Sequence, residues 1–149
     1  MNTSVSHKVE TLQALEQEMG VMVRRIRRVI VERARAVDPE LQIAGFLVLS
    51  YLGDAGPARS ADVVDSLGID KGAISRHVQH LVDLGLIGRE PDPEDGRASL
   101  LQVTTHGRDR LAVMAEQRRS NLEEKLADWD DDELEAFVAA LSRYNRSLD

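Results

Sequence analysis

The stretch SADVVDSLGIDKGAISRHVQHLVDLGLIGREPDPEDGRASLLQVT, residues 60–104, decides the fold because its hydrophobic pattern changes along its length. It begins with two runs in which apolar residues recur at three- and four-residue steps, as they do on one face of a helix. It ends with two short apolar runs, Leu86–Glu90 and Ser99–Thr104, joined by the polar segment PDPEDGRA. This second pattern is typical of a hairpin, so the stretch predicts two short helices followed by two strands.

The boundaries of the two helices follow from residues that favour helix ends. The first helix is expected to begin at a Ser60 cap and to end before Gly68, which suits the left-handed backbone position after a helix. The second is expected to begin at Asp70, an N-cap whose charge also suits the helix dipole, and to end at Gly85. The order helix, short turn, helix, hairpin is the winged helix-turn-helix arrangement, in which the second helix lies in the major groove of DNA.

The second helix has one apolar face, and its opposite side carries polar and small residues. Ile74, Val78 and Leu81 fall on the apolar face, which is expected to pack onto the domain. Arginine and glutamine pair bidentately with guanine and adenine edges, while serine and lysine suit phosphates. The residues expected to contact DNA are Lys71, Gly72, Ser75, Arg76, Gln79 and His80. For this helix alone, an amphipathic helix with a solvated polar face is an equally good alternative.

The hairpin loop holds one arginine among acidic residues. Arg97 lies where the tip of a wing would enter the minor groove, whose negative potential attracts inserted arginine. Asp95 is expected to brace the Arg97 guanidinium through a charge-assisted hydrogen bond. Pro91 and Pro93 are expected to stiffen the loop and to keep it out of the strand ladder. A polar hairpin loop without a role in DNA binding is the alternative.

Helical periodicity also precedes this segment. Residues 9–36 predict a long amphipathic helix, which ends at Asp38-Pro39 because proline disfavours the helical conformation in the residue before it. Residues 40–52 are nearly all apolar and predict a buried helix, followed by a turn at GDAGP.

The helical period returns after the hairpin, from Thr105 onward. A last helix is expected to begin at Asp130, which forms a capping-box pattern with Glu133, and Trp129 and Leu134 are placed as a hydrophobic staple around it. We therefore expect a mainly α protein with a small β-hairpin.

The whole chain, residues 1–149, is expected to form a single domain. Its winged helix-turn-helix core would occupy residues 40–104, between long helical segments at 9–36 and 105–148.

The composition excludes several classes of protein and of site. The chain has no cysteine, which excludes disulfides and zinc–thiolate sites, and no apolar run approaches the roughly 18 residues of a membrane-spanning helix. No secretory signal is visible, so a cytoplasmic protein without a membrane partner is expected. His77 and His80 lack an obvious third metal ligand, so no metal site is expected. No group of residues suits catalysis, and we expect neither an enzyme nor a cofactor.

The distribution of charge matters more than the net charge of −7, which by itself argues against a nucleic-acid partner. Residues 22–35 carry six arginines and one glutamate, a local charge of +5. Residues 123–149 carry nine acids and three bases, a local charge of −6, whereas residues 59–110 are nearly balanced at −2. The acidity is therefore concentrated at the C-terminal end, away from the segment expected to contact DNA.

The segment that begins at residue 60 and runs through THG at 105–107 resembles the core of the MarR (multiple-antibiotic-resistance regulator) transcription factors. The resemblance is carried by LGIDKGAISRHVQHL, by LGLIGREPDPEDGRA with its D-x-R, and by VTTHGRDRL. It implies a homodimer formed by the first helix and the last two, with each wing in a minor groove. It matches Asp95 and Arg97 to the family's wing pair, and Ser75 and Arg76 to its recognition-helix step. Residues 42–45, QIAG, lack the glutamine that the family often carries later in that helix, so the resemblance assigns no effector-binding residue.

Four arginines of the first helix allow two interpretations: Arg24, Arg25, Arg27 and Arg28. They could contact phosphate or an anionic effector, since the resemblance implies that small aromatic acids often bind near the dimer cleft. The alternative, favoured by the complementary segment charges, is a solvated face with ion pairs to the acidic C-terminal helix of a partner subunit.

These patterns together predict a homodimeric, ligand-responsive transcriptional regulator, a repressor, that binds a pseudo-palindromic operator in double-stranded DNA. The expected effector is a small aromatic or anionic molecule. The alternative function is a winged-helix protein–protein interaction module that does not bind DNA.

Overall fold

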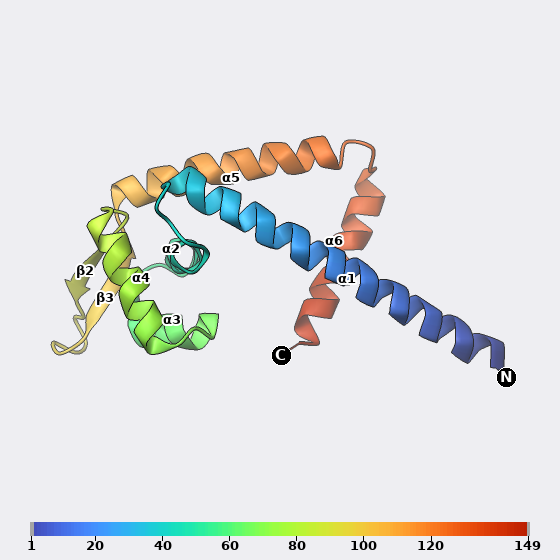
Figure 1. The fold of residues 1–149 in the computed structure, drawn as a ribbon, viewed down its shortest axis with the longest axis horizontal. Coiled ribbons are helices and arrows are strands. Elements are labelled where there is room, and N and C mark those ends of the chain that lie inside the picture. Colours follow the sequence, from blue (N-terminus) through green and yellow to red (C-terminus); the bar gives the residue numbers. More distant parts are fainter. Residues whose placement is uncertain (1, 149) are drawn as a thin grey trace. The chain divides into compact units, whose positions relative to one another are not determined.

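The computed structural model describes the backbone of residues 2–148 and the side chains of residues 6–148. The elements in chain order are α1 (Asn2–Val37), α2 (Ile43–Ala55), β1 (Ala58–Arg59), α3 (Ser60–Leu67), α4 (Lys71–Asp83), β2 (Ile87–Pro91), β3 (Ser99–Val103), α5 (Thr105–Lys125) and α6 (Asp131–Arg146). Figure 1 shows this order along the chain. The chain forms two compact units, one ending at Met114 and the other beginning at Ala115, and α5 crosses the boundary between them.

The first unit contains a small antiparallel sheet in the order β1-β3-β2. The two long strands pair from Ile87 opposite Val103 to Pro91 opposite Ser99, which confirms the predicted hairpin. The prediction that Pro91 stays out of the ladder is wrong, because Pro91 is the last residue of β2. β2 is an edge strand, and proline is tolerated there because its missing N–H can face solvent.

The hydrophobic core of the first unit lies where α2 and α4 pack against each other and against the sheet. Its fully buried large side chains come from α2, α3, α4, the segment before β2, and the two long strands: Val48, Leu49, Leu52, Val63, Ile74, Val78, Leu81, Leu86, Ile87 and Leu101. The mean hydropathy of α2 is high enough to explain why it is buried on most sides. The predicted class, mainly α with a small β-hairpin, is confirmed.

Several helix ends differ from the sequence predictions. α1 begins at Asn2 rather than at residue 9, and α2 begins at Ile43 rather than at residue 40. The predicted turn GDAGP is wrong in its first three residues, which continue α2 until Gly56, where φ is 79°. Gly68, with φ of 61°, ends α3 as predicted.

The start of α3 is also corrected. Ser60, the predicted cap, is the first helical residue, and Arg59 occupies the cap position. The Arg59 backbone N–H donates a hydrogen bond of 3.1 Å to the carboxylate of Asp62 in the first turn. An acidic side chain at this place also suits the helix dipole.

The second unit comprises the end of α5 and α6. Asp130 accepts a hydrogen bond from the Glu133 backbone at 2.8 Å, and Glu133 accepts one from the Asp130 backbone at 3.1 Å, which confirms the predicted capping box. The Trp129 and Phe137 rings meet edge to face with centroids 5.6 Å apart.

None of the described side chains of α6 is buried. Its apolar face and the end of α5 line an open groove of about 630 Å³, whose apolar residues are Leu122, Leu126, Leu134, Phe137, Val138 and Leu141. Within residues 2–148, no helix combines the length and the hydropathy needed to cross a bilayer.

Candidate nucleic-acid interface

The helix α4 is fixed by its cap and by its apolar face. The Asp70 side chain accepts hydrogen bonds from the backbone N–H groups of Gly72 and Ala73 at 2.9 and 3.1 Å, which confirms the predicted N-cap. Ile74 and Leu81 are fully buried. The opposite side of the helix faces solvent.

The residues of α4 that the sequence predicts to contact DNA lie on this solvent-facing side. Five of them are exposed: Lys71, Gly72, Ser75, Arg76 and Gln79. The sixth, His80, is half-buried. The helix therefore presents most of the predicted set to a partner.

Gln79 is engaged by its neighbours. Arg89 on β2 donates a hydrogen bond of 3.2 Å to the Gln79 carbonyl oxygen, and the Gln79 amide donates one of 2.9 Å to Asp83. Each end of the amide is therefore held by one hydrogen bond, which leaves one N–H and one oxygen lone pair unused by these two contacts. Arg89 carries no sequence signal of its own; it adds a cation beside α4 because that helix packs against β2.

His77 faces the body of the unit rather than the exposed side of α4. It is half-buried, and a Cβ atom at Gly45 on α2 would lie 3.8 Å from the His77 Nδ1 atom. Burial lowers the pKa of His77 below its ordinary value of 6.5, and the nearby charges of Arg76 and His80 lower it further. Within the described residues, no group of three or more potential ligands is placed to hold a metal ion.

The wing loop between β2 and β3 is folded by hydrogen bonds of its own. The Asp92 backbone N–H donates to the Ala98 carbonyl at 3.0 Å, and the Ala98 N–H donates to the Asp95 carbonyl at 2.9 Å. Asp95 and Arg97 are both exposed. The loop therefore presents Arg97 on an ordered turn.

The predicted brace between Asp95 and the Arg97 guanidinium is wrong. The Asp95 carboxylate instead accepts a hydrogen bond of 3.1 Å from the Arg97 backbone N–H. Among residues 6–148, the ion pairs involve neither the Asp95 nor the Arg97 side chain. The short aspartate side chain reaches the amide two residues on, as in an Asx-turn, and this local contact orders the backbone of the tip.

The ion pair at the wing joins Arg59 of β1 to Asp92 at the base of the loop. The Asp92 Oδ2 atom lies 2.6 Å from the Arg59 Nε atom and 2.5 Å from its terminal nitrogen. The Asp92 Oδ1 atom accepts a hydrogen bond of 2.9 Å from the Glu94 backbone N–H. Asp92 is 6% exposed, and among residues 6–148 it is the one charged residue that is buried.

The pair shifts both pKa values in the direction expected of an ion pair. The hydrogen bond from the Glu94 backbone, followed by the contacts with Arg59, lowers the pKa of Asp92 below its ordinary value of 3.8 although its burial opposes the shift. The hydrogen bond and the charge of Asp92 raise the pKa of Arg59. The sequence offers no signal for this pair because its members are 33 positions apart.

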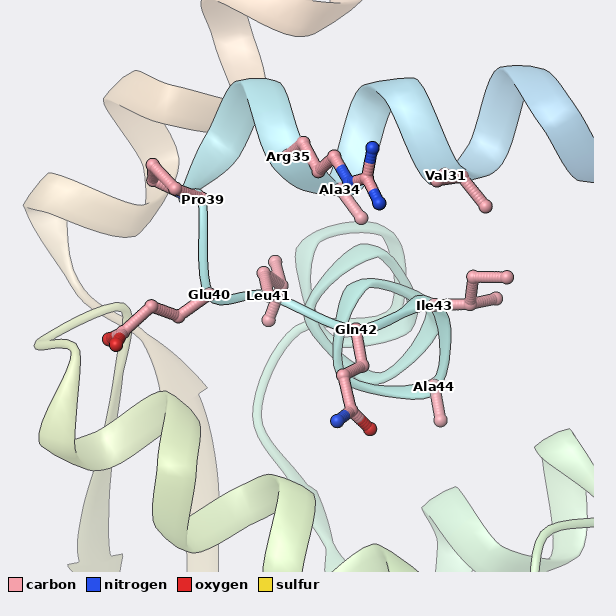
Figure 2. Close-up of a pocket in the computed structure, with 9 residues that line it drawn as sticks. All are labelled: Val31, Ala34, Arg35, Pro39, Glu40, Leu41, Gln42, Ile43 and Ala44. Carbon is pink, nitrogen blue, oxygen red and sulfur yellow. The ribbon is translucent and has the colours of Figure 1, made fainter.

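A cavity of about 430 Å³ lies in the first unit between the end of α1 and the start of α2. Figure 2 shows Arg35 on the same stretch of α1 as Ala34 and Val31, above the loop that leads into α2. The Glu40 carboxylate points away from Arg35. The cavity therefore combines apolar side chains with the exposed guanidinium of Arg35 and the polar side chains of Glu40 and Gln42.

The four arginines singled out on α1, Arg24, Arg25, Arg27 and Arg28, are exposed. None of the four takes part in an ion pair within the described residues.

Comparison with known proteins identifies the family. The MarR family model matches residues 41–98, which contain α2, the helix-turn-helix, β2 and the wing loop. YxaD of Bacillus subtilis, an uncharacterized HTH-type transcriptional regulator, is 30% identical over 137 residues, which are 92% of this chain and 94% of that protein. NicR of Pseudomonas putida, an HTH-type transcriptional repressor, is 28% identical over 100 residues, 66% of this chain and 63% of that protein.

Solved structures show the same fold. The crystal structure of a MarR family transcription regulator matches with a TM-score of 0.81 at 20% identity, over 98% of this chain and 97% of that one. BpsR of Bordetella bronchiseptica, described with a mechanism for regulation of its DNA binding by 6-hydroxynicotinic acid, matches with a TM-score of 0.59 at 25% identity, over 86% of this chain and 98% of that one. The chain belongs to the MarR family, whose members are transcriptional regulators and not enzymes.

Proposed function

We propose that this protein is a cytoplasmic, homodimeric repressor that binds a pseudo-palindromic operator and is released from it by a small aromatic acid. The observation that carries the proposal is the set of exposed cations on the recognition helix and the wing. Lys71 and Arg76 on α4, Arg89 on β2 and Arg97 on the wing are all exposed in the first unit. The assignment of a repressor is supported by the similarity to NicR.

The roles within this interface follow from side-chain chemistry. Arg76 would read a guanine edge in the major groove, because a guanidinium pairs bidentately with its two acceptors. Lys71 and Ser75 would contact phosphates. Gly72 would let the helix backbone approach the groove, since it places no side chain between the backbone and the DNA. Arg97 would enter the minor groove.

Gln79, His80 and Asp95 belong to the same interface in supporting roles. Gln79 would act in a group with Arg89, because the two side chains are hydrogen-bonded. His80, which is half-buried, would contact the backbone of the DNA at the edge of the interface. Asp95 would act on the wing turn through the Arg97 backbone N–H.

The second copy of the chain would cover the apolar side chains that the second unit leaves exposed. Phe137, Val138 and Leu141 are 48%, 58% and 38% exposed, an arrangement that one chain alone does not bury. The positive segment 22–35 and the negative segment 123–149 are complementary in charge. Arginines of α1 in one subunit would therefore pair with acids of α6 in the other.

The effector would occupy the cavity between α1 and α2, where Arg35 would bind its carboxylate. A charge-assisted pair of guanidinium and carboxylate is strong and directional, and the apolar walls suit an aromatic ring. The similarity to BpsR supports an aromatic acid of the size of 6-hydroxynicotinic acid. Such a ligand would shift the dimer toward the arrangement that it binds better.

The experiment is fluorescence anisotropy on a duplex selected from fragments of the source genome. Arg76→Ala and Arg97→Ala should each weaken binding by about 1–3 kcal/mol, while Arg118→Ala on α5, which removes an exposed arginine outside this interface, serves as the control. Unchanged binding by both arginine variants would refute the assigned interface. Failure of the parent protein to bind any duplex at low salt would favour the protein-interaction alternative.

A further inference from the structure

We propose that Arg59 is a positioning residue for DNA binding: through Asp92 it holds the wing loop in the conformation that presents Arg97. This inference rests on the proposed function and assigns a role to a residue outside the recognition helix and the wing. Arg59 lies on β1, and Asp92 begins the loop whose far side carries Arg97.

The contacts place Arg59 between two parts of the DNA-binding unit. Its backbone N–H donates to Asp62 in the first turn of α3, and its side chain binds Asp92 through two nitrogens. The same residue therefore ties the helix-turn-helix to the wing. Movement of the wing relative to α3 would break one of these contacts.

Asp92 passes this constraint to the loop. Its carboxylate accepts from the Glu94 backbone, its backbone carbonyl accepts from the Asp95 N–H at 3.2 Å, and its N–H donates to the Ala98 carbonyl. Asp95 in turn binds the backbone N–H of Arg97. Asp92 thus connects Arg59 to the tip through a continuous series of hydrogen bonds, and removing the Arg59 side chain leaves a buried charge that is costly to keep in place.

A direct contact between Arg59 and a DNA phosphate is the competing explanation, because the Arg59 side chain is 42% exposed. The two explanations predict opposite results for Asp92→Asn. Removing an acid next to DNA strengthens binding on electrostatic grounds, whereas loosening the wing weakens it.

The experiment compares DNA affinity by anisotropy for the parent, Arg59→Gln, Asp92→Asn and the double variant. Each single variant should bind DNA at least about fivefold more weakly than the parent, and its loss of affinity should not exceed that of Arg97→Ala. The affinity of the double variant should equal that of either single variant, because both changes break the same contact. In an Arg97→Ala background, Asp92→Asn should have no further effect. Arg59→Lys, which keeps the charge, should recover part of the loss. Urea unfolding of each variant identifies any change due to global stability.

Equal or tighter binding by Asp92→Asn would overturn the inference. A loss of DNA affinity in Arg59→Gln but not in Asp92→Asn would also overturn it, if the slope of log affinity against log salt concentration became shallower by about 0.9. That change in slope marks the loss of one phosphate contact. Amide hydrogen exchange without DNA provides an independent test: the Ala98 N–H should exchange faster in Asp92→Asn and Arg59→Gln. If the parent binds no duplex, the proposed function fails, and unchanged exchange at Ala98 would then separately overturn the role of Arg59 in ordering the wing.

Discussion

Gly107 occupies a position in α5 where no side chain fits. A Cβ atom there would lie 2.1 Å from the Leu86 carbonyl oxygen and 2.7 Å from a Val103 methyl group. Gly107→Ala should therefore destabilise the protein by about 1–3 kcal/mol, measured by urea unfolding, because backbone must move to admit the methyl group. Gly88→Ala is the matched control, since a Cβ at Gly88 meets nothing within 4 Å. Equal stability of both variants would contradict the described packing of α5.

His77 predicts a pH dependence of stability. Burial, then Arg76 and His80, lower its pKa in the folded protein, so the unfolded chain binds the proton more tightly. The contribution of His77 is therefore fully present above its ordinary pKa of 6.5 and is lost as the pH falls below that value toward the folded pKa. Urea unfolding at about pH 7.5 and about pH 5.5 should show this loss in the parent and a smaller one in His77→Gln. An identical loss in both proteins would exclude His77 as its source.

Single residues could be predicted where their role depends on near neighbours in the sequence. Asp70, Gly68 and the pair of Asp130 and Glu133 act within three or four positions, and the structure confirms them. The partner of Arg59 is distant in the chain, and only the folded sheet brings it close. Asp95 and Arg97 are in contact as predicted, but through the Arg97 backbone N–H and not through its guanidinium. The spacing of the two residues in the sequence does not distinguish between these two donors.

The end of α1 is held by a side chain from another helix. Arg110 on α5 donates hydrogen bonds to the carbonyls of Ala36, at 2.6 Å, and Val37, at 2.9 and 3.1 Å. A cation bound to the last carbonyls of a helix also interacts favourably with its dipole.

Arg110→Ala should cost about 1.5–3 kcal/mol of unfolding free energy, since it leaves part-buried carbonyls without a charged donor. Arg119→Ala on the same helix removes exposed ion pairs with Glu116 and Glu123 and should cost about 1 kcal/mol or less. Urea unfolding measures both, and a larger effect at Arg119 would contradict the assigned contact.

Elements could be predicted where periodicity is sustained. The long helices and the hairpin repeat their pattern over enough residues to be recognised, but β1 has only two residues and gains its conformation from pairing with Leu100 and Leu101. Proline generally weakens a strand ladder because it has no N–H to donate. Pro91 lies at the end of an edge strand, where this missing hydrogen bond costs little, and the position of β2 in the sheet cannot be recognised from the sequence.

At the scale of the molecule, dimerisation can be tested on the exposed face of α6. Val138→Asp should leave the chain folded, because Val138 is 58% exposed, and should convert a dimer to monomer in sedimentation velocity. An unpaired charge buried by the partner would cost about 3–5 kcal/mol. Ala136→Asp makes a comparable change on the opposite side of α6 and should remain dimeric. A parent protein that sediments as a monomer, or a dimer unaffected by Val138→Asp, would refute this interface.

The molecule as a whole illustrates why net charge is a weak guide to partners. The acids that make the chain negative are concentrated in residues 123–149, whereas the side of α4 and the wing carries exposed cations. The fold class and the family followed from residues 60–104, where helix periods, caps and hairpin pattern agree. The proposed dimer and the proposed operator would both involve contacts beyond one chain, which the sequence pattern of a single chain does not encode.

The most direct test of the central claim is the affinity of the parent protein for a selected genomic duplex and for a shuffled duplex of equal composition, measured by anisotropy at two salt concentrations. Sequence-specific DNA binding predicts a preference on the order of a thousandfold for the selected duplex, with both affinities falling as salt rises. Equal affinity for both duplexes, or no binding at the lower salt concentration, would contradict it.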